Sequence, residues 1–201
     1  MMAVVYYGDI LDPEMCRDRY ERWKAIIPEE EIIYREGTKE YYRSVSAHML
    51  VCQVLLNKYL IFDPVVIGRE ESGRPVLISP AGFHLSITHG GKMVACAVSA
   101  VTPVGIDVQP IGKIAPRVLE NLYTENEREY VGCDPERFTE IWTRKESFVK
   151  MTGTGINRDI GRIDTITGEN TNGAVFTTKR IGKKYLTLCT ADDDEALFEG
   201  R

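Results

Sequence analysis

The sequence predicts an α+β protein made of two similar lobes, each a small antiparallel sheet packed with helices. Two observations lead to this prediction. Strand-like apolar runs and segments of helical periodicity occur together in both halves of the chain, and the pattern starts over after Pro103. No low-complexity linker separates the halves, so we expect residues 1–102 and 103–201 to pack as one compact unit.

The first half is expected to contain strands and two helices. Helical periodicity covers residues 13–25 and, more strongly, residues 41–60. A turn followed by an extended piece is expected at residues 70–77, because Gly73 and Pro75 are turn formers. Apolar runs rich in β-branched residues predict strands at 3–10, 83–88 and 93–100, the last two joined by a turn at 89–92.

The second half begins with a short strand and ends with three more. The strands are predicted at residues 104–109, 164–169, 174–180 and 184–190, and two helices at residues 115–123 and 124–131. A longer helix follows, for which Asp134 is the expected N-cap with Pro135 in the first turn. Gly153 is expected just past its end.

This long helix carries a lysine where a core residue is expected. At about 100° per residue, its apolar face is formed by Phe138, Ile141, Trp142 and Val149. Lys145 lies in the middle of that face, and Glu146 and Lys150 lie at its edge, one turn apart. A lysine in an apolar stripe is rarely tolerated unpaired. The helix is therefore expected to direct an ammonium and a carboxylate into a cleft.

Composition excludes several classes of protein. The net charge of −5 argues against bulk attraction to nucleic acid, so an anionic ligand would need a local cluster of donors. No apolar run approaches the roughly 20 residues that span a bilayer, and the first residues do not resemble a secretory signal. The five cysteines are widely spaced, which indicates reduced thiols. We therefore expect a cytoplasmic location.

Three acidic residues on separate elements are candidate ligands for Mg²⁺. Asp107 lies near a strand end, Glu146 on the long helix, and Glu127 between them. Two or three such carboxylates can hold Mg²⁺, which prefers oxygen ligands and keeps several waters. Glu127 has an alternative role, since Thr124 and Glu127 have the spacing of a capping box. Both roles can coexist, because a carboxylate has several lone-pair sites.

Donors suited to phosphate occur at a strand end. Residues 86–92 place Thr88, His89, two glycines and a lysine together, and glycines allow backbone amides to approach an anion closely. The alternative is an ordinary hairpin turn with a surface histidine. Arg74 lies between a glycine and a proline, where it is either a fixed phosphate contact or a solvated turn residue.

Taken in order, five motifs resemble those of one family. They are GRP, SITHGG, GIDVQ, TENE and WTRKESFVKMTGTGI, and the resemblance covers residues 43–156. The chain resembles the 4′-phosphopantetheinyl transferases, specifically the single-chain type that activates surfactin synthetase. This resemblance implies a pseudo-twofold fold of two similar lobes with the active site between them. It also implies Mg²⁺-dependent transfer of the phosphopantetheinyl arm of coenzyme A to a serine of an apo carrier protein, with release of adenosine 3′,5′-bisphosphate.

The resemblance assigns roles to matching positions. The implied metal ligands are Asp107, Glu146 and Glu127, with Gln109 at a further position of the metal site. Glu146, or a metal-bound water, is the implied base, and Lys150 and Glu127 assist catalysis. The implied contacts to coenzyme A are Arg43, Ser44, Arg74, Thr88, His89, Lys145 and Lys150, with Lys145 itself held by acids of the site.

The chain departs from the family pattern in two places. The family often has glutamate where this chain has Gln109, which offers an oxygen without a charge. The stretch that aligns with the family's N-terminal lysines, which hold the 3′-phosphate of coenzyme A, is acidic here (residues 28–36). Arg35, Lys39 or Arg43 are possible substitutes.

There are two alternatives to an active transferase, of which the departures motivate the first. One is a non-catalytic module that binds coenzyme A or a carrier protein on the same fold. The other is a metal-dependent phosphohydrolase that uses the same acids on a water. Because carrier proteins of this kind tend to be acidic, exposed basic residues are candidate docking positions. These are Lys113, Arg117, Arg128 and Arg137. Two lobes in one chain favour a monomer.

Overall fold

The computed structural model describes residues 3–28, 32–155, 158–191 and 196–201. The helices are α1 (Pro13–Trp23), α2 (Lys39–Tyr59), α3 (Pro116–Leu122), α4 (Glu125–Val131) and α5 (Pro135–Thr152), and η2 (Arg158–Arg162) is a 3₁₀ turn. The strands are β1 (Ala3–Asp9), β2 (Val66–Arg69), β3 (Pro75–Ser79), β4 (His84–Gly90), β5 (Met93–Ser99), β6 (Val104–Pro110), β7 (Val175–Ile181), β8 (Lys184–Thr190) and β9 (Ala196–Gly200). The α+β fold class is confirmed.

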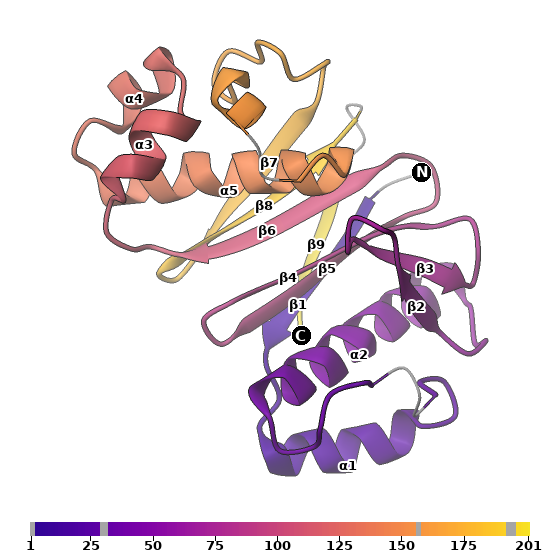
Figure 1. The fold of residues 1–201 in the computed structure, drawn as a ribbon. Coiled ribbons are helices and arrows are strands. Elements are labelled where there is room, and N and C mark those ends of the chain that lie inside the picture. Colours follow the sequence, from indigo (N-terminus) through magenta and orange to yellow (C-terminus); the bar gives the residue numbers. More distant parts are fainter. Residues whose placement is uncertain (1–2, 29–31, 156–157, 192–195) are drawn as a thin grey trace.

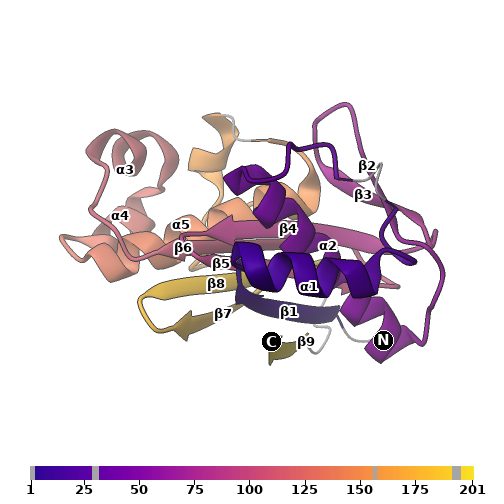
Figure 2. The same cartoon turned by 90° about the horizontal axis from the view of Figure 1, so that it is seen from below.

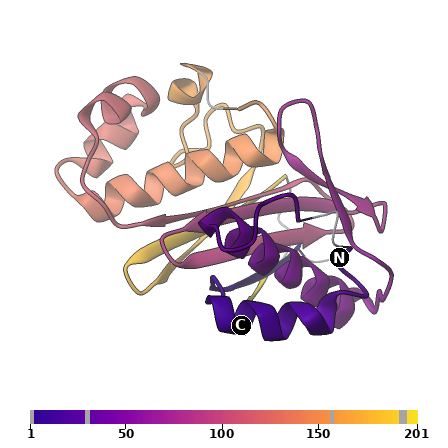
Figure 3. The ribbon, with the colours of Figure 1, turned by 60° about the horizontal axis from the view of Figure 1, so that its bottom comes forward.

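The strands form three small sheets. A four-stranded sheet has the order β4-β5-β1-β9, a three-stranded sheet has the order β6-β8-β7, and β2 pairs with β3. Figure 1 shows α5 lying along the three-stranded sheet, with α1 and α2 on the other side of the molecule beside the four-stranded sheet. Figures 2 and 3 show the same arrangement from below and from an intermediate angle. The strands therefore lie between two helical layers.

The predicted signals of the long helix act as expected. The Asp134 carboxylate accepts hydrogen bonds from the backbone N–H groups of Glu136 and Arg137, Pro135 occupies the first turn, and Gly153 ends the helix with a φ of 72°. The face that contains Ile141 and Val149 is buried. The helix α5 therefore begins and ends where its capping residues and its helical periodicity predicted.

Residues 164–169 are not a strand, so that prediction was wrong. They form a turn, because the Asp164 carboxylate accepts hydrogen bonds from the backbone N–H groups of Ile166 at 2.9 Å and Thr167 at 2.8 Å. Aspartate commonly competes with strand pairing in this way. Two strands, β2 and β9, were not predicted. β9 comes from the end of the second half but pairs in parallel with β1 of the first.

The two halves meet where β4 lies beside β6. The Ser86 and Thr88 hydroxyls on β4 accept hydrogen bonds from the backbone N–H groups of Ile106 and Val108 on β6, at 3.0 and 3.4 Å. The backbones approach so closely that a Cβ added at Gly90 would lie 2.4 Å from the Val108 carbonyl oxygen. Short polar side chains and a glycine thus hold the halves together. The pseudo-twofold relation between them, and the boundary near residue 102, stay predictions.

Helix α2 ends in a residue that is poorly suited to its conformation. Leu60 has a φ of 56° in the left-handed region, and its side chain is 74% exposed. We expect Leu60→Gly to stabilise the protein by about 0.5–1 kcal/mol, because glycine adopts this conformation without steric cost and little buried surface is lost. Urea unfolding measures the change. Asn57→Gly, inside the same helix, should instead destabilise the protein by a few tenths of a kcal/mol, which is about the difference in helix propensity between asparagine and glycine. Equal effects of the two variants would contradict the prediction.

Candidate active site

Asp107 of β6 is the centre of a cluster of polar groups between the two halves. Its Oδ1 accepts a hydrogen bond from the Thr88 hydroxyl at 3.0 Å and forms an ion pair with the Lys150 ammonium at 2.6 Å. Its Oδ2 accepts a hydrogen bond from the Gln109 side-chain amide at 3.2 Å. The Asp107 side chain is almost fully buried, while Lys150 is about one-third exposed. The structure thus brings four of the predicted site residues together.

Thr88 connects the cluster to the first half. Its hydroxyl donates to Asp107 and accepts from the Val108 backbone N–H and from the Lys150 ammonium, the latter at 3.1 Å. A hydroxyl has one proton and two lone pairs, so this threonine is fully satisfied within the protein. Thr88 is therefore placed to orient Asp107 and Lys150.

Glu146 joins the same cluster from α5, one turn before Lys150. Burial raises the pKa of Glu146 to about 7, and the nearby Asp107 carboxylate adds to the increase, while Lys150 partly opposes it. Glu146 accepts no hydrogen bond from any residue that the structure describes. The carboxylates of Asp107 and Glu146, which are distant in the sequence, therefore lie near each other. Asp107 is paired with the Lys150 ammonium, whereas Glu146 has no hydrogen-bond donor among the described residues to offset its burial.

A cavity of about 480 Å³, within the usual size of small-molecule sites, is lined by residues of the first half, among them His89, which follows Thr88 on β4. Arg43, Ser44 and His89 line it, as predicted for contacts to a phosphorylated ligand. Sequence reasoning did not select Arg69 or His48, which also line it. The complete lining is Ile33, Tyr34, Glu40, Arg43, Ser44, Ala47, His48, Ile67, Gly68, Arg69, Pro75, Ile87, His89 and Val94.

The cavity and the cluster are electrostatically connected through His89. Desolvation and the Arg43 guanidinium lower the pKa of His89, and the Lys150 and Asp107 charges also act on it. His89 therefore lines the cavity and is near enough to Lys150 and Asp107 for their charges to act on it. Of the three basic residues considered as substitutes for N-terminal lysines, only Arg43 is in the described lining, since Arg35 and Lys39 are not part of it. Residues 29–31 of the acidic stretch lie outside the described residues.

Arg74 contacts both halves of the molecule. Its guanidinium forms two hydrogen bonds with the Glu70 carboxylate, at 3.0 and 2.7 Å, and donates to the Met151 carbonyl near the end of α5 at 3.2 Å. Glu70 already neutralises this arginine. The geometry shows Arg74 tying the β2–β3 turn to α5, so a phosphate contact would have to compete with Glu70.

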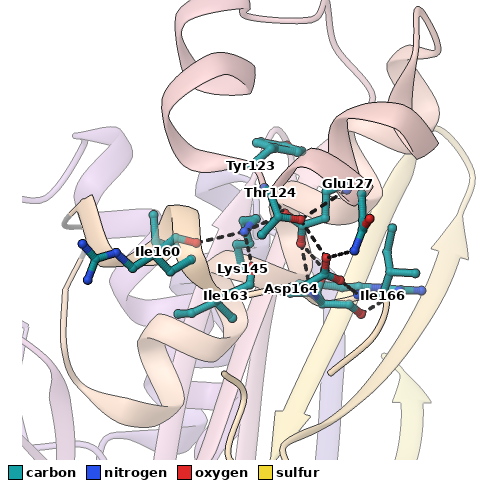
Figure 4. A network of polar contacts seen from close by, with 12 residues as sticks. Tyr123, Thr124, Glu127, Lys145, Ile160, Ile163, Asp164 and Ile166 are labelled. Carbon is teal, nitrogen blue, oxygen red and sulfur yellow. Dashed lines mark hydrogen bonds and ion pairs between the residues drawn. The ribbon is translucent and has the colours of Figure 1, made fainter. Parts of the chain in front are cut away.

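Glu127 and Lys145 lie apart from the Asp107 cluster. Both side chains are fully buried and form an ion pair of 2.7 Å with each other (Figure 4). The predicted capping box between Thr124 and Glu127 is present. Burial lowers the pKa of Lys145, and the Glu127 charge opposes that decrease. Among the described residues, neither Glu127 nor Lys145 contacts Asp107 or Glu146. Of the three acids that were predicted to lie together, the structure therefore brings together Asp107 and Glu146 and leaves Glu127 apart.

The described residues contain no group of three or more His, Cys, Asp or Glu side chains arranged to hold a metal ion. The two carboxylates of Asp107 and Glu146 nevertheless suit Mg²⁺, which proteins usually bind through one or two carboxylates together with substrate phosphates and waters. Burial is the main cause of the raised pKa of Glu146, and repulsion from the Asp107 carboxylate, against one neighbouring ammonium on Lys150, adds to it. A divalent cation held by these two acids, with the Gln109 side-chain oxygen as a further ligand, would offset that repulsion.

Comparison with known proteins shows similarity to one group. Residues 103–197 match the family model described as the 4′-phosphopantetheinyl transferase superfamily. The chain is 26% identical to 4′-phosphopantetheinyl transferase Sfp of Bacillus subtilis (strain 168), over 75% of this chain and 71% of the relative. It is 28% identical to 4′-phosphopantetheinyl transferase psf-1 of Bacillus pumilus, over 73% and 66%.

A third relative is more similar over a shorter region. 4′-Phosphopantetheinyl transferase gsp of Aneurinibacillus migulanus is 32% identical over 60% of this chain and 52% of the relative. The alignments thus leave 29%, 34% and 48% of the three relatives unmatched. No helix in the described ranges is long and apolar enough to cross a membrane.

Proposed function

Since this chain belongs to the 4′-phosphopantetheinyl transferase superfamily, we propose that it moves the phosphopantetheinyl arm of coenzyme A to a serine hydroxyl of an apo carrier protein. The other product would be adenosine 3′,5′-bisphosphate. One observation carries this proposal beyond the family name. Asp107, Glu146 and Lys150 converge at the boundary of the two halves, and His89, on which the Asp107 and Lys150 charges act, lines a cavity that also has two arginines.

The cavity would hold the nucleotide end of coenzyme A. Arg43 and Arg69 line it from α2 and β2, and His89 lines it from β4. Cationic and N–H donors suit the phosphates, while Ile67 and Ile87 offer apolar surface. The diphosphate would then reach the cluster, where Lys150 is free to exchange Asp107 for a phosphoryl oxygen because its side chain remains partly exposed.

Glu146 is the proposed base for the serine hydroxyl. Without a metal ion, Glu146 has a pKa of about 7. A nearby cation would lower this pKa and favour the carboxylate form that accepts the serine proton. The serine oxygen would attack the β-phosphorus of the diphosphate, and the bond to the leaving adenosine bisphosphate would break. Lys150 would stabilise charge on the phosphoryl oxygens. When bound at Asp107 and Glu146, Mg²⁺ would supply further neutralisation of the diphosphate.

The acceptor is proposed to dock near α3, α4 and the start of α5. Lys113, Arg117, Arg128 and Arg137 are all exposed there. Arg128 and Arg137 also donate to backbone carbonyls of Tyr123 and Tyr130, which limits their freedom. The identity of the carrier, the monomeric state and the cytoplasmic location stay predictions.

A non-catalytic binding module is the second candidate function. The Gln109 amide donates to Asp107, so this position adds no negative charge to the proposed metal site. A weakened metal site would leave coenzyme A binding intact and lower turnover. Isothermal titration that shows coenzyme A binding, in a protein that transfers nothing, would favour this candidate.

The decisive test is to incubate the purified protein with coenzyme A, Mg²⁺ and a panel of apo carrier proteins. We expect mass spectrometry to show one phosphopantetheinyl group added to at least one carrier, on its serine. No mass gain across a broad panel would contradict the proposal. Release of adenosine bisphosphate in samples without any carrier would instead indicate a phosphohydrolase.

A further inference from the structure

The ion pair between Glu127 and Lys145 is closed to any ligand. The three N–H groups of the Lys145 ammonium face Glu127 Oε2 at 2.7 Å and the carbonyl oxygens of Ile160 and Ile163 at 2.9 and 2.5 Å. Glu127 also accepts hydrogen bonds from the Thr124 N–H at 2.9 Å and from the N–H and hydroxyl of Thr165 at 2.9 and 3.0 Å. With all donors and lone pairs used and no exposed surface, neither side chain can touch metal or substrate.

The pair joins three segments that are separate in the sequence. Glu127 belongs to α4, Lys145 to α5, and their other partners to residues 160–165 (Figure 4). Asp164 extends the network, because its carboxylate accepts hydrogen bonds from the Thr124 hydroxyl at 2.7 Å and the Asn126 amide at 3.3 Å. The network therefore holds one side of α5 against α4 and residues 160–165.

The same helix carries the reactive groups on its adjacent side. Glu146 follows Lys145 directly, so helical geometry places it about 100° further around the axis, and Lys150 lies one turn beyond Glu146. The close packing of α5 on Gly105 of β6 sets the distance between the helix and the strand. This packing does not by itself set the rotation of α5 about its own axis. The three fixed partners of the buried Lys145 ammonium do set that rotation.

We propose that Glu127 and Lys145 are a positioning pair, which fixes the rotation of α5 so that Glu146 and Lys150 converge on Asp107. This assignment replaces the metal-ligand and cofactor-contact roles that the family resemblance implied for the two residues. It rests on the proposed transferase function for its kinetic test. Removing one partner leaves an uncompensated buried charge, which the protein relieves by shifting α5, whereas removing both charges leaves no such force.

The test compares Glu127→Gln, Lys145→Met and the double variant with the wild-type protein. Under conditions where circular dichroism shows all four folded, each single variant is expected to lower kcat for carrier modification about tenfold or more, because reacting groups are misplaced. The double variant is expected to return kcat to within about threefold of wild type, since both charges are gone. KM for coenzyme A should stay within about twofold throughout, because the cavity lies in the other half.

A matched control uses an ion pair far from α5. Lys58 on α2 pairs with Glu199 on β9, and both side chains are partly buried. Lys58→Met should retain the wild-type kcat and KM. If the single charge deletions do not fold, Glu127→Asp serves in their place, because it keeps the charge and shortens the reach to Lys145. A lowered kcat of this variant supports the proposal, and a wild-type kcat overturns it.

Two kinetic outcomes overturn the inference. Folded single variants with a wild-type kcat would show that the pair contributes only stability. A double variant whose loss equals the product of the two single losses would show that Glu127 acts independently on the reaction.

Hydrogen exchange separates failure of the inference from failure of the proposed function. Amides of residues 144–150 should exchange faster in each single variant and return toward wild-type rates in the double variant. If the wild-type protein transfers nothing, the function fails and this pattern still supports the positioning role. Unchanged exchange in the single variants would overturn it.

Discussion

Glu146→Gln is expected to abolish phosphopantetheinyl transfer and, at the same time, to stabilise the protein above neutral pH. Glutamine has nearly the same shape but can neither accept the serine proton nor contribute charge to a metal site. Loss of the base alone costs a factor of about 100 to 10,000, so kcat should fall below the detection limit of a carrier mass assay. A fully active variant would remove Glu146 from both proposed roles.

The stability gain follows from the raised pKa of Glu146. Between the ordinary value of 4.5 and about 7, the folded protein keeps a proton that the unfolded chain has released, so the wild-type protein loses stability as pH rises. Below 4.5 both states are protonated, and above about 7 the full penalty is present. Without added Mg²⁺, the free energy of unfolding of Glu146→Gln at pH 8 should therefore exceed that of the wild-type protein by about 2 kcal/mol. This value is reduced from the full pKa shift because the side chain keeps some access to solvent.

Urea unfolding at pH 4 and pH 8 measures this difference. It should vanish at the lower pH and be fully developed at the higher one. Glu136→Gln is the matched control on the same helix, because the Glu136 carboxylate is 42% exposed and paired with Arg180. The control should show full activity and little pH-dependent gain. A Glu146→Gln variant that is less stable than wild type at pH 8 would contradict the burial argument.

Gly105→Ala is expected to damage both stability and activity, because α5 lies directly on this glycine. An added Cβ would be 1.9 Å from the Ser147 carbonyl oxygen and 2.4 Å from the Met151 backbone nitrogen. Backbone atoms of a helix cannot move aside individually, so the whole of α5 has to shift away from β6. Overpacking of this kind should destabilise by about 3 kcal/mol.

The same shift would separate Glu146 and Lys150 from Asp107, which is two residues along β6 from Gly105. Misplacement of reacting groups by about 1 Å can cost a hundredfold in rate, and we expect kcat to fall by about that factor in the folded variant. Gly112→Ala is the control, because the nearest atom to its added Cβ is the Pro110 carbonyl oxygen at 3.8 Å. Comparable losses in the two variants would show that close packing at Gly105 is not the cause.

The sequence predicted the parts of the site that depend on local patterns or on the family motifs. Helical periodicity and an N-cap located α5 and the buried position of Lys145, and the motif GIDVQ together with KES singled out Asp107 and Glu146. It did not predict that Asp164 would form a turn in place of a strand. The alternation of apolar residues after Asp164 favours a strand, whereas an aspartate that accepts hydrogen bonds from the next backbone N–H groups favours a turn. The tertiary partner of Asp164, the Thr124 hydroxyl, favours the turn.

By itself, the sequence determined the α+β class, the main helices and strands, and which residue types are available for phosphate chemistry, since these follow from neighbours along the chain. Only the tertiary structure decided which partners those residues meet. Glu127 faces a buried lysine, Arg74 faces Glu70, and Arg69 faces the cavity beside Arg43. Such pairings join segments far apart in sequence, so they depend on how the helices and sheets pack and leave no local signal.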